Sequence, residues 1–290
     1  MNITYLPLVM NGETTMADGE LISGNDTFTI VTDISKYQPT IDYKKMRARG
    51  CRGVGIRLTG NDQEDKLAEK HWKSVQDADM IPIGYGWMEY RSLYMKPPVV
   101  QAQKYLDVLY KVNGSVENVL SYLDYEQPNS NWPALPDYKT GIKWLTEWYS
   151  IVDPSIKRLS GLYGNRNTID SLQTWYAPLP FKTSTRPLWI AAWVFNRLIV
   201  PEEMKTITWR PNIKPWAKFS LWQVGLTLGE PFGVGEESKE LDLDMFPGTA
   251  EELRIYAGYK PVVVPPPVPP TLEQRVEKLE SEARLHGWSV

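Results

Sequence analysis

Cysteine and histidine are almost absent from this sequence of 290 residues. It holds one cysteine, Cys51, and two histidines, His71 and His286. A single cysteine excludes an intramolecular disulfide, and so few thiols and imidazoles exclude a thiolate or histidine-rich metal centre. A Ser-His-Asp triad would depend on His71, but this residue falls on the apolar stripe of a predicted helix, which indicates a histidine in the core. Acid–base chemistry therefore falls to carboxylates.

A strong excess of charge of one sign is also missing. The 32 Lys and Arg residues face 35 Asp and Glu residues, for a net charge of −3, whereas nucleic-acid binding calls for a basic excess. No stretch approaches the about 18–20 apolar residues of a membrane span. The N-terminus lacks the basic start and apolar run of a signal peptide. We expect no nucleic-acid partner, no membrane span and no cleaved leader.

Hydrophobic residues make up 42% of the chain and charged residues 23%, which is typical of a folded globular protein. Phenylalanine is scarce, with 6 residues, beside 12 Trp and 16 Tyr. Trp and Tyr combine a flat apolar face with a polar group, as do the residues that line wet clefts. Core packing accounts for most of them.

The sequence divides into four zones. We predict an N-terminal arm (1–27), a folded body (28–258), a proline-rich linker (259–270) and an amphipathic helix (271–290). The linker is expected to be extended, because proline can neither continue a helix nor donate to a sheet.

The predicted C-terminal helix begins with a capping box, Thr271–Gln274. Its apolar residues follow a heptad pattern, at Leu272, Val276, Leu279 and Ala283. This pattern predicts a weak homo-oligomer through residues 271–286. The alternatives are that the stripe folds back onto the body or binds a foreign partner.

Within the body, short apolar runs alternate with amphipathic helical patterns, which lie at Leu67–Ala78, Ala102–Tyr110 and Trp144–Ile151. The runs are Phe28–Ile34, Val54–Leu58, Ile81–Trp87, Val119–Tyr125, Leu159–Tyr163, Leu188–Trp193, Phe219–Val224 and Leu241–Met245. Eight runs interleaved with helices predict an α/β fold, a mainly parallel sheet closed into a (β/α) barrel. The connections after the sixth and seventh runs are poor in helical pattern, so the barrel is expected to be irregular.

Acidic residues gather where the predicted strands end, which is where parallel barrels carry their chemistry. They are Asp33, Asp124, Glu126, Asp242 and Asp244. Residues two apart on a strand point to the same side, about 6.5–7 Å apart. Two carboxylates that close in a dry site raise one pKa, which leaves a protonated acid beside an ionised partner. The Asp124-Tyr125-Glu126 triplet therefore predicts the cleavage of an acetal.

An ordered series of motifs resembles glycoside hydrolase family 25, the Chalaropsis-type lysozymes. The matching segments are Thr32–Gln38, Ile41–Tyr43, Gly55–Gly60, Ile83–Tyr85, Leu123–Glu126, Leu188–Ala191, Leu221–Gln223 and Leu241–Phe246. The resemblance implies an irregular β/α barrel that cleaves the β-1,4 bond between N-acetylmuramic acid and N-acetylglucosamine in peptidoglycan. It implies no cofactor and no metal.

The resemblance also implies roles for four acids. Glu126 is expected to protonate the leaving oxygen, and Asp124 to be the ionised neighbour that orients the 2-acetamido group of the substrate for attack on the anomeric carbon. Asp33 and Asp242 are expected to flank them. The stereochemical outcome stays open, because substrate-assisted enzymes escape the rule based on carboxylate separation.

A second group of residues is expected to contact the substrate. Tryptophans near strand ends could stack on a sugar ring, although core packing is an equal alternative for each. The sequence departs from the family's pattern after Tyr85, where Gly86 and Trp87 follow, and at Asp244, where an Asn is usual. The predicted substrate-contacting residues are Tyr85, Trp87, Arg57, Trp189, Trp222 and Asp244.

Two other functions stay open. The protein could be a virion-associated or wall-binding structural protein that keeps the lysozyme fold, or a glycosidase on another 2-acetamido polymer. The lack of a leader together with the C-terminal tail favours a phage endolysin that acts from the host cytoplasm on the cell wall, with a non-classical route out of the cell as the alternative.

Overall fold

The computed structural model describes residues 28–91, 95–126, 137–168, 185–214 and 216–260, together with Ser281. Its strands are β1 (Thr29–Ile34), β2 (Cys51–Gly60), β3 (Gln63–Glu64), β4 (Ile81–Trp87), β5 (Ser121–Asp124), β6 (Gly161–Asn165), β7 (Leu188–Ala191), β8 (Leu221–Leu228) and β9 (Glu240–Phe246). Its helices are α1 (Tyr43–Ala48), α2 (Ala68–Asp77), α3 (Pro98–Asn113), α4 (Tyr138–Ile156) and α6 (Ala250–Tyr256), with short 3₁₀ helices η2 (Pro201–Thr206) and η3 (Glu230–Phe232).

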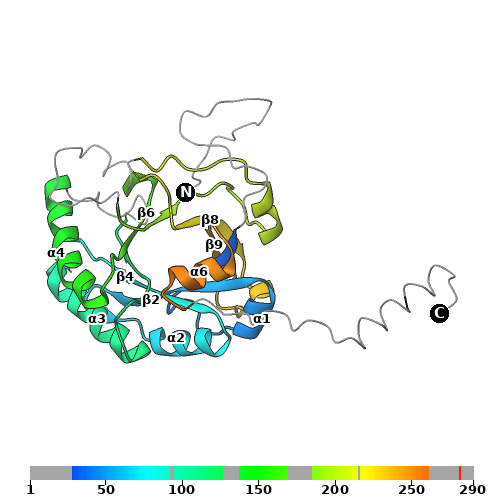
Figure 1. Ribbon diagram of the computed structural model, residues 1–290, viewed down its shortest axis with the longest axis horizontal. Coiled ribbons are helices and arrows are strands. Elements are labelled where there is room, and N and C mark those ends of the chain that lie inside the picture. Colours follow the sequence, from blue (N-terminus) through cyan, green and yellow to red (C-terminus); the bar gives the residue numbers. More distant parts are fainter. Residues whose placement is uncertain are drawn as a thin grey trace. The chain divides into compact units, whose positions relative to one another are not determined.

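The strands form one sheet that closes on itself. Its order is β1-β9-β8-β7-β6-β5-β4-β2-β3, and a parallel pairing of β1 with β2 completes the ring (Figure 1). The expected eight runs all form strands, and β3 is a two-residue addition to β2. The prediction of an irregular, mainly parallel barrel is confirmed.

Strand β9 runs against its neighbours. It pairs antiparallel with both β8 and β1, whereas the successive pairs from β1–β2 to β7–β8 are parallel. The link from β8 to β9 contains only the 3₁₀ turn η3, and a parallel return needs a crossover of about a dozen residues or more. Because β9 is reversed, its first residues lie at the barrel edge where the parallel strands end.

The helices divide between the outside and one end of the barrel. Helices α2, α3 and α4 lie outside the sheet, where their apolar faces cover the outward side chains of the strands (Figure 1). Helix α6 contributes Leu253 and Ala257 to the apolar cluster inside the barrel, so it closes the end opposite the carboxyl ends of the strands. The three long helices were expected from their periodicity, while α1 and α6 were not.

Trp189 fills the middle of the barrel. It makes edge-to-face contacts with Tyr85, Tyr122 and Tyr163. The facing position on β2 is Gly55, where a Cβ atom would lie 2.5 Å from the indole ring. The missing side chain on β2 is therefore what makes room for the indole, and the packed interior forms a floor beneath the open edge.

The chain divides into two units, Met1–Lys260 and Pro261–Val290. The predicted arm (1–27), the proline run and nearly all of the heptad helix lie outside the described residues, so their predictions stand as made. Among the described residues, no helix is long and apolar enough to cross a bilayer.

Candidate active site

The five acids singled out in the sequence meet at the open edge of the barrel. Asp33 lies near the end of β1, and Asp124 ends β5, with Glu126 two residues beyond it. Asp242 stands directly opposite Asp33 in the antiparallel β1–β9 ladder, and Asp244 is two residues further along β9. Alternate residues of a strand share a face, so these side chains all point inward.

Asp33 is held by a neutral side chain. Gln223 Nε2 donates to Asp33 Oδ2 at 3.0 Å, and Gln223 Oε1 accepts from Trp193 Nε1 at 3.0 Å and from the Tyr163 hydroxyl at 3.4 Å. Burial raises the pKa of Asp33 to about 6, and the Gln223 hydrogen bond and the Arg57 charge limit that rise.

Glu126 combines partial burial with a single observed side-chain hydrogen bond. Asn165 Nδ2, at the end of β6, donates to Glu126 Oε2 at 3.1 Å. Burial, and next the negative charge of Asp33, raise the pKa of Glu126 to about 7, although the Asn165 hydrogen bond opposes this. Near neutral pH this carboxyl can therefore exist in both protonation states, as a general acid requires.

Asp124 lies deeper than Glu126. Asp124 is 8% exposed, and its Oδ1 atom is buried and has no hydrogen-bond partner among the described residues. Burial, and then the charges of Glu126 and Asp33, raise the pKa of Asp124 well above its usual range. The sequence predicted one protonated and one ionised member with Asp124 ionised. In the ligand-free site both pKa values are raised, and burial favours the proton on Asp124 at least as strongly as on Glu126.

Asp242 and Asp244 extend the acid cluster onto β9. Burial, followed by the charges of Asp33 and Glu126, raises the pKa of Asp242 well above its usual range. Asp244 is fully buried, and its Oδ1 atom accepts a hydrogen bond from Trp189 Nε1 at 2.7 Å. Burial, with Asp33 and Asp242 adding to it, also raises the pKa of Asp244 well above the usual range.

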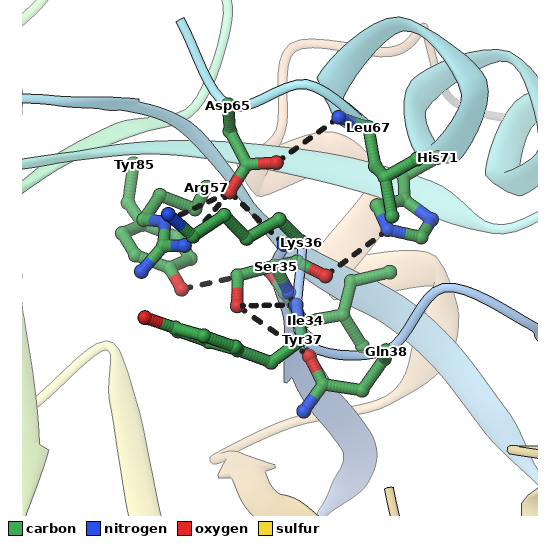
Figure 2. Close-up of polar contacts among 10 residues, drawn as sticks. All are labelled: Ile34, Ser35, Lys36, Tyr37, Gln38, Arg57, Asp65, Leu67, His71 and Tyr85. Atoms are coloured by element: carbon green, nitrogen blue, oxygen red, sulfur yellow. Dashed lines mark hydrogen bonds and ion pairs between the residues drawn. The ribbon is translucent and has the colours of Figure 1, made fainter. Parts of the chain in front are cut away.

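The cation that faces this cluster is already paired. Arg57 on β2 lowers the pKa of Asp33 and Asp124. Its Nε and Nη2 atoms, however, both lie 2.9 Å from Asp65 Oδ2 (Figure 2). Because Asp65 already offsets this positive charge, ionisation of all five acids together is unfavourable, and protons held within the cluster relieve their repulsion.

Asp65 also fixes the loop that follows β1. It accepts the backbone N–H of Lys36 at 3.0 Å and that of Leu67, at the start of α2, at 3.1 Å (Figure 2). In this loop the Tyr37 side chain is 63% exposed, and its ring lies 5.2 Å from the Arg57 guanidinium carbon. The hydrogen bonds to Asp65 thus position the loop that carries Tyr37 beside the site.

His71 lies behind this loop and takes no direct part in the acid cluster. Its Nε2 donates to the Ser35 carbonyl at 3.2 Å (Figure 2), and the Tyr43 hydroxyl donates to its Nδ1. The side chain is 1% exposed, and burial lowers its pKa. The prediction of a satisfied core histidine is confirmed.

The predicted substrate-contacting residues fall in different places. Tyr85 faces the acid cluster from β4, with its hydroxyl donating to the Ile34 carbonyl at 3.5 Å (Figure 2), and Trp87 ends the same strand. Arg57 faces the cluster from β2. For these three residues, substrate contact stays a prediction.

The prediction is wrong for the other three. Trp222 is fully buried and points outward, against Trp209 and Phe219, because its neighbour Gln223 takes the inward position. Trp189 and Asp244 do point inward, but they are at most 1% exposed and form the floor beneath Asp33. None of them offers a surface to a sugar ring.

Gln223 and Asn165 are site residues that the sequence did not single out. Each is the polar inward residue of a strand, and each donates a hydrogen bond to one of the acids. Trp193, considered only as one of several tryptophans, is 53% exposed and bonded to Gln223, so it stands at the rim. A polar residue in an otherwise apolar strand is the sequence signal that could have identified Gln223 and Asn165.

Among the described residues, no group of three or more His, Cys, Asp or Glu residues could hold a metal ion.

Comparison with known structures supports the same fold. A family 25 lysozyme from Aspergillus fumigatus aligns with a TM-score of 0.56 at 18% identity, over 80% of this chain and 99% of that chain. A bacterial lysozyme from Streptomyces coelicolor aligns with a TM-score of 0.57 at 19% identity, over 79% and 96%. The catalytic domain of an endolysin from a bacteriophage of Listeria monocytogenes aligns with a TM-score of 0.53 at 18% identity, over 80% and 98%.

Among curated proteins, no sequence matches this chain. The pattern that defines Glycosyl hydrolases family 25, however, matches residues 32–224, more than half of the chain. The match runs from β1 to β8 and includes Asp33, Asp124 and Glu126. The chain therefore belongs to glycosyl hydrolase family 25, and it is a glycoside hydrolase.

Proposed function

We propose that this enzyme hydrolyses peptidoglycan at the β-1,4 bond between N-acetylmuramic acid and N-acetylglucosamine. The observation that carries the proposal is the pair Asp124 and Glu126, both with raised pKa values, at the open edge of the barrel. The lysozymes and muramidases with the same fold support the choice of substrate.

Glu126 is the general acid in this proposal. It lies beyond the end of β5 and is less buried than Asp124, so it is the member of the pair within reach of a bound glycosidic oxygen. Its proton passes to that oxygen as the bond to the anomeric carbon breaks. With a pKa of about 7, Glu126 is largely protonated in mildly acidic solution and can take a proton back from water in the next step.

Asp124 acts on the 2-acetamido group. The carbonyl oxygen of that group attacks the anomeric carbon, and its N–H donates to Asp124. A hydrogen bond to the ionised form lowers a carboxyl pKa. The hydrogen bond from the substrate N–H therefore lowers the pKa of Asp124 and favours its ionised form. Asp33 and Asp242 flank the reacting groups, and their charges influence the protonation of Asp124 and Glu126.

The release of reducing ends from defined peptidoglycan tests the proposal. The wild-type protein should release them, and a folded Glu126→Gln variant should not. N-acetylglucosamine oligomers serve as the second substrate, because they carry the same acetamido group without the muramic acid. Cleavage of these oligomers alone would move the assignment to a different 2-acetamido polymer. Absence of cleavage of both substrates by folded wild-type protein would favour a structural role in a virion or a wall-binding role.

The C-terminal segment is proposed to associate weakly with copies of itself through residues 271–286. A helix of this length is marginal alone, since about 12–15 residues is the usual lower limit, and its heptad stripe needs a partner. The mass in solution of the full chain and of a chain that ends at Lys260 tests this. A full chain that stays monomeric at high concentration would contradict self-association. Association would suit a phage lysis enzyme or a virion component, the biological setting that we propose.

A further inference from the structure

The hydrogen bonds of Asp244 are unusual for a carboxylate. The side chain is 0% exposed, and its Oδ1 atom accepts from Trp189 Nε1 at 2.7 Å. Its Oδ2 atom has no hydrogen-bond partner among the described residues. An ionised carboxylate in such a place would leave half of its charge unsolvated, at a cost that proteins avoid by keeping the group neutral.

Asp244 is also in contact with another carboxyl group. It lies on the inward face of β9, two residues from the position opposite Asp33, and its carboxyl group interacts with that of Asp33. Two neighbouring carboxylates repel each other in a buried site, whereas a carboxyl that holds a proton can donate a hydrogen bond to its ionised neighbour, so the arrangement favours a proton on one of the two acids. Asp33 already accepts from Gln223 Nε2 and is partly exposed, whereas Asp244 has no exposure. The proton therefore belongs on Asp244.

We propose that Asp244 is a neutral, protonated acid that donates a hydrogen bond to Asp33 and holds the ionised Asp33 carboxylate in place beside the Asp124–Glu126 pair. It is a positioning residue, because it is buried beneath Asp33 and touches no substrate. The chain Trp189–Asp244–Asp33–Gln223–Trp193 then links the barrel floor to the exposed rim. In this chain Asp244 accepts from one neighbour and donates to the other.

Other titratable groups surround this pair, and they favour the same state. Those that interact with Asp33 or Asp244 are Asp242 on the same strand, Cys51 and Arg57 on β2, Tyr85 on β4, Asp124 and Glu126 of β5, and Tyr163 on β6. Strands β7 and β8 contribute Trp189 and Gln223, which do not titrate. Among the described residues Arg57 is the cation of this group, and it is paired with Asp65, so a second negative charge beside Asp33 would gain little from it.

Two variants separate a neutral donor from a charged acid. Asp244→Asn keeps one acceptor for Trp189 and one N–H for Asp33, and it cannot ionise. Asp244→Leu has a similar size but neither accepts nor donates. The inference rests on the proposed function for its activity readout, so the first measurement is of folding alone.

The folding measurement is the equilibrium constant of urea unfolding for the wild type and Asp244→Asn between pH 4 and pH 8. A carboxyl with a raised pKa in the folded state stabilises most at low pH and loses that contribution as the pH rises. The folding constant of the wild type, relative to Asp244→Asn, should therefore fall by up to tenfold per pH unit above about pH 4. A ratio that does not change with pH would overturn the proposal.

The activity measurement compares kcat and KM. Asp244→Leu should lower kcat by about 10- to 100-fold, the effect of losing one hydrogen bond to a charged group, with little change in KM. Asp244→Asn should restore kcat. Loss of activity in a folded Asp244→Asn protein, or a change confined to KM, would overturn the positioning role. If the wild type cleaves no peptidoglycan, the proposed function fails, while the pH dependence of folding still decides the protonation state.

Discussion

Two sets of buried or partly buried acids differ in their partners. The first set lies outside the acid cluster, and each of its members is paired with an arginine. The pairs are Asp153 with Arg186 at 2.6 Å, Asp65 with Arg57 at 2.9 Å, and Glu89 with Arg91 at 2.5 Å. At the open edge, the side-chain hydrogen bonds that the clustered acids accept come from two carboxamides and an indole.

The two glutamates Glu89 and Glu126 make the comparison direct. Burial alone would raise the pKa of Glu89, but hydrogen bonds from Arg91 lower the pKa overall. Glu126 is partly buried, no cation pairs with it among the described residues, and its pKa rises to about 7. Burial is thus common to both, and the partner decides the direction of the shift. A buried acid with an arginine holds the fold together, whereas a buried acid without one is poised for proton transfer.

The largest effect expected is on cleavage by Glu126→Gln. The substitution keeps the shape and removes the proton donor, so cleavage should fall by about 10²–10⁴-fold while the fold survives. Reducing-end release measures the loss, and circular dichroism checks the fold. Wild-type turnover by a folded Glu126→Gln variant would show that Glu126 is not the general acid.

Asp124→Asn and Asp242→Asn should differ in size of effect. Asn at position 124 cannot supply the negative charge that stabilises the attacking acetamido group, so turnover should fall by about 10²-fold. Asp242 is a flanking residue whose pKa burial raises well above its usual range, so the neutral Asn should replace it with a smaller effect. A loss of about tenfold or less is expected. A silent Asp242→Asn together with an inactive Asp244→Asn would instead mean that the catalytic position on β9 is two residues further along.

The paired set should respond in stability rather than in turnover. Asp153→Leu leaves Arg186 buried without its counterion, with side-chain exposures of 7% and 16% in the native pair. It should lower the free energy of unfolding by about 3 kcal/mol. Urea unfolding measures this, and activity per folded molecule should stay unchanged. The double variant with Arg186→Met should lose less stability than Asp153→Leu alone, because no orphaned charge remains. Greater loss in the double variant would contradict the pairing argument.

The sequence predicted much of the fold and the acid pair for physical reasons. Strand segments and the long helices have strong periodic patterns, and the spacing of Asp124 and Glu126 places both on one side of a strand whatever the strand's neighbours are. The short helices α1 and α6 carry too few residues for a pattern, and the reversal of β9 depends on how it pairs with β8 and β1.

The direction of side chains was the weak point of the sequence prediction. In a barrel covered by helices, strands are apolar on both faces, so the pattern does not tell inside from outside. Trp222 and Gln223 show the consequence, because a shift of one residue exchanges the two faces. The partners of the acids, Gln223 and Asn165, come from strands far apart in the sequence, and only the closed sheet brings them to the cluster.

The smallest expected effect concerns the pH dependence of cleavage. Glu126 must be protonated to act, so kcat/KM, which reports the free enzyme, should fall as the pH rises through about 7. The hydrogen bond from Asn165 favours the ionised form and lowers this pKa. Asn165→Ala removes the bond, so the pKa should rise and the alkaline limb should move to higher pH by up to about one unit. Asn113→Ala is the matched control, since Asn113 accepts from Trp72 Nε1 on the outer helices and does not contact the acids. That variant should leave the limb in place. An alkaline limb that stays fixed in Asn165→Ala, or moves to lower pH, would mean that a group other than Glu126 sets it. The absence of an arginine partner would then no longer explain why this acid transfers the proton.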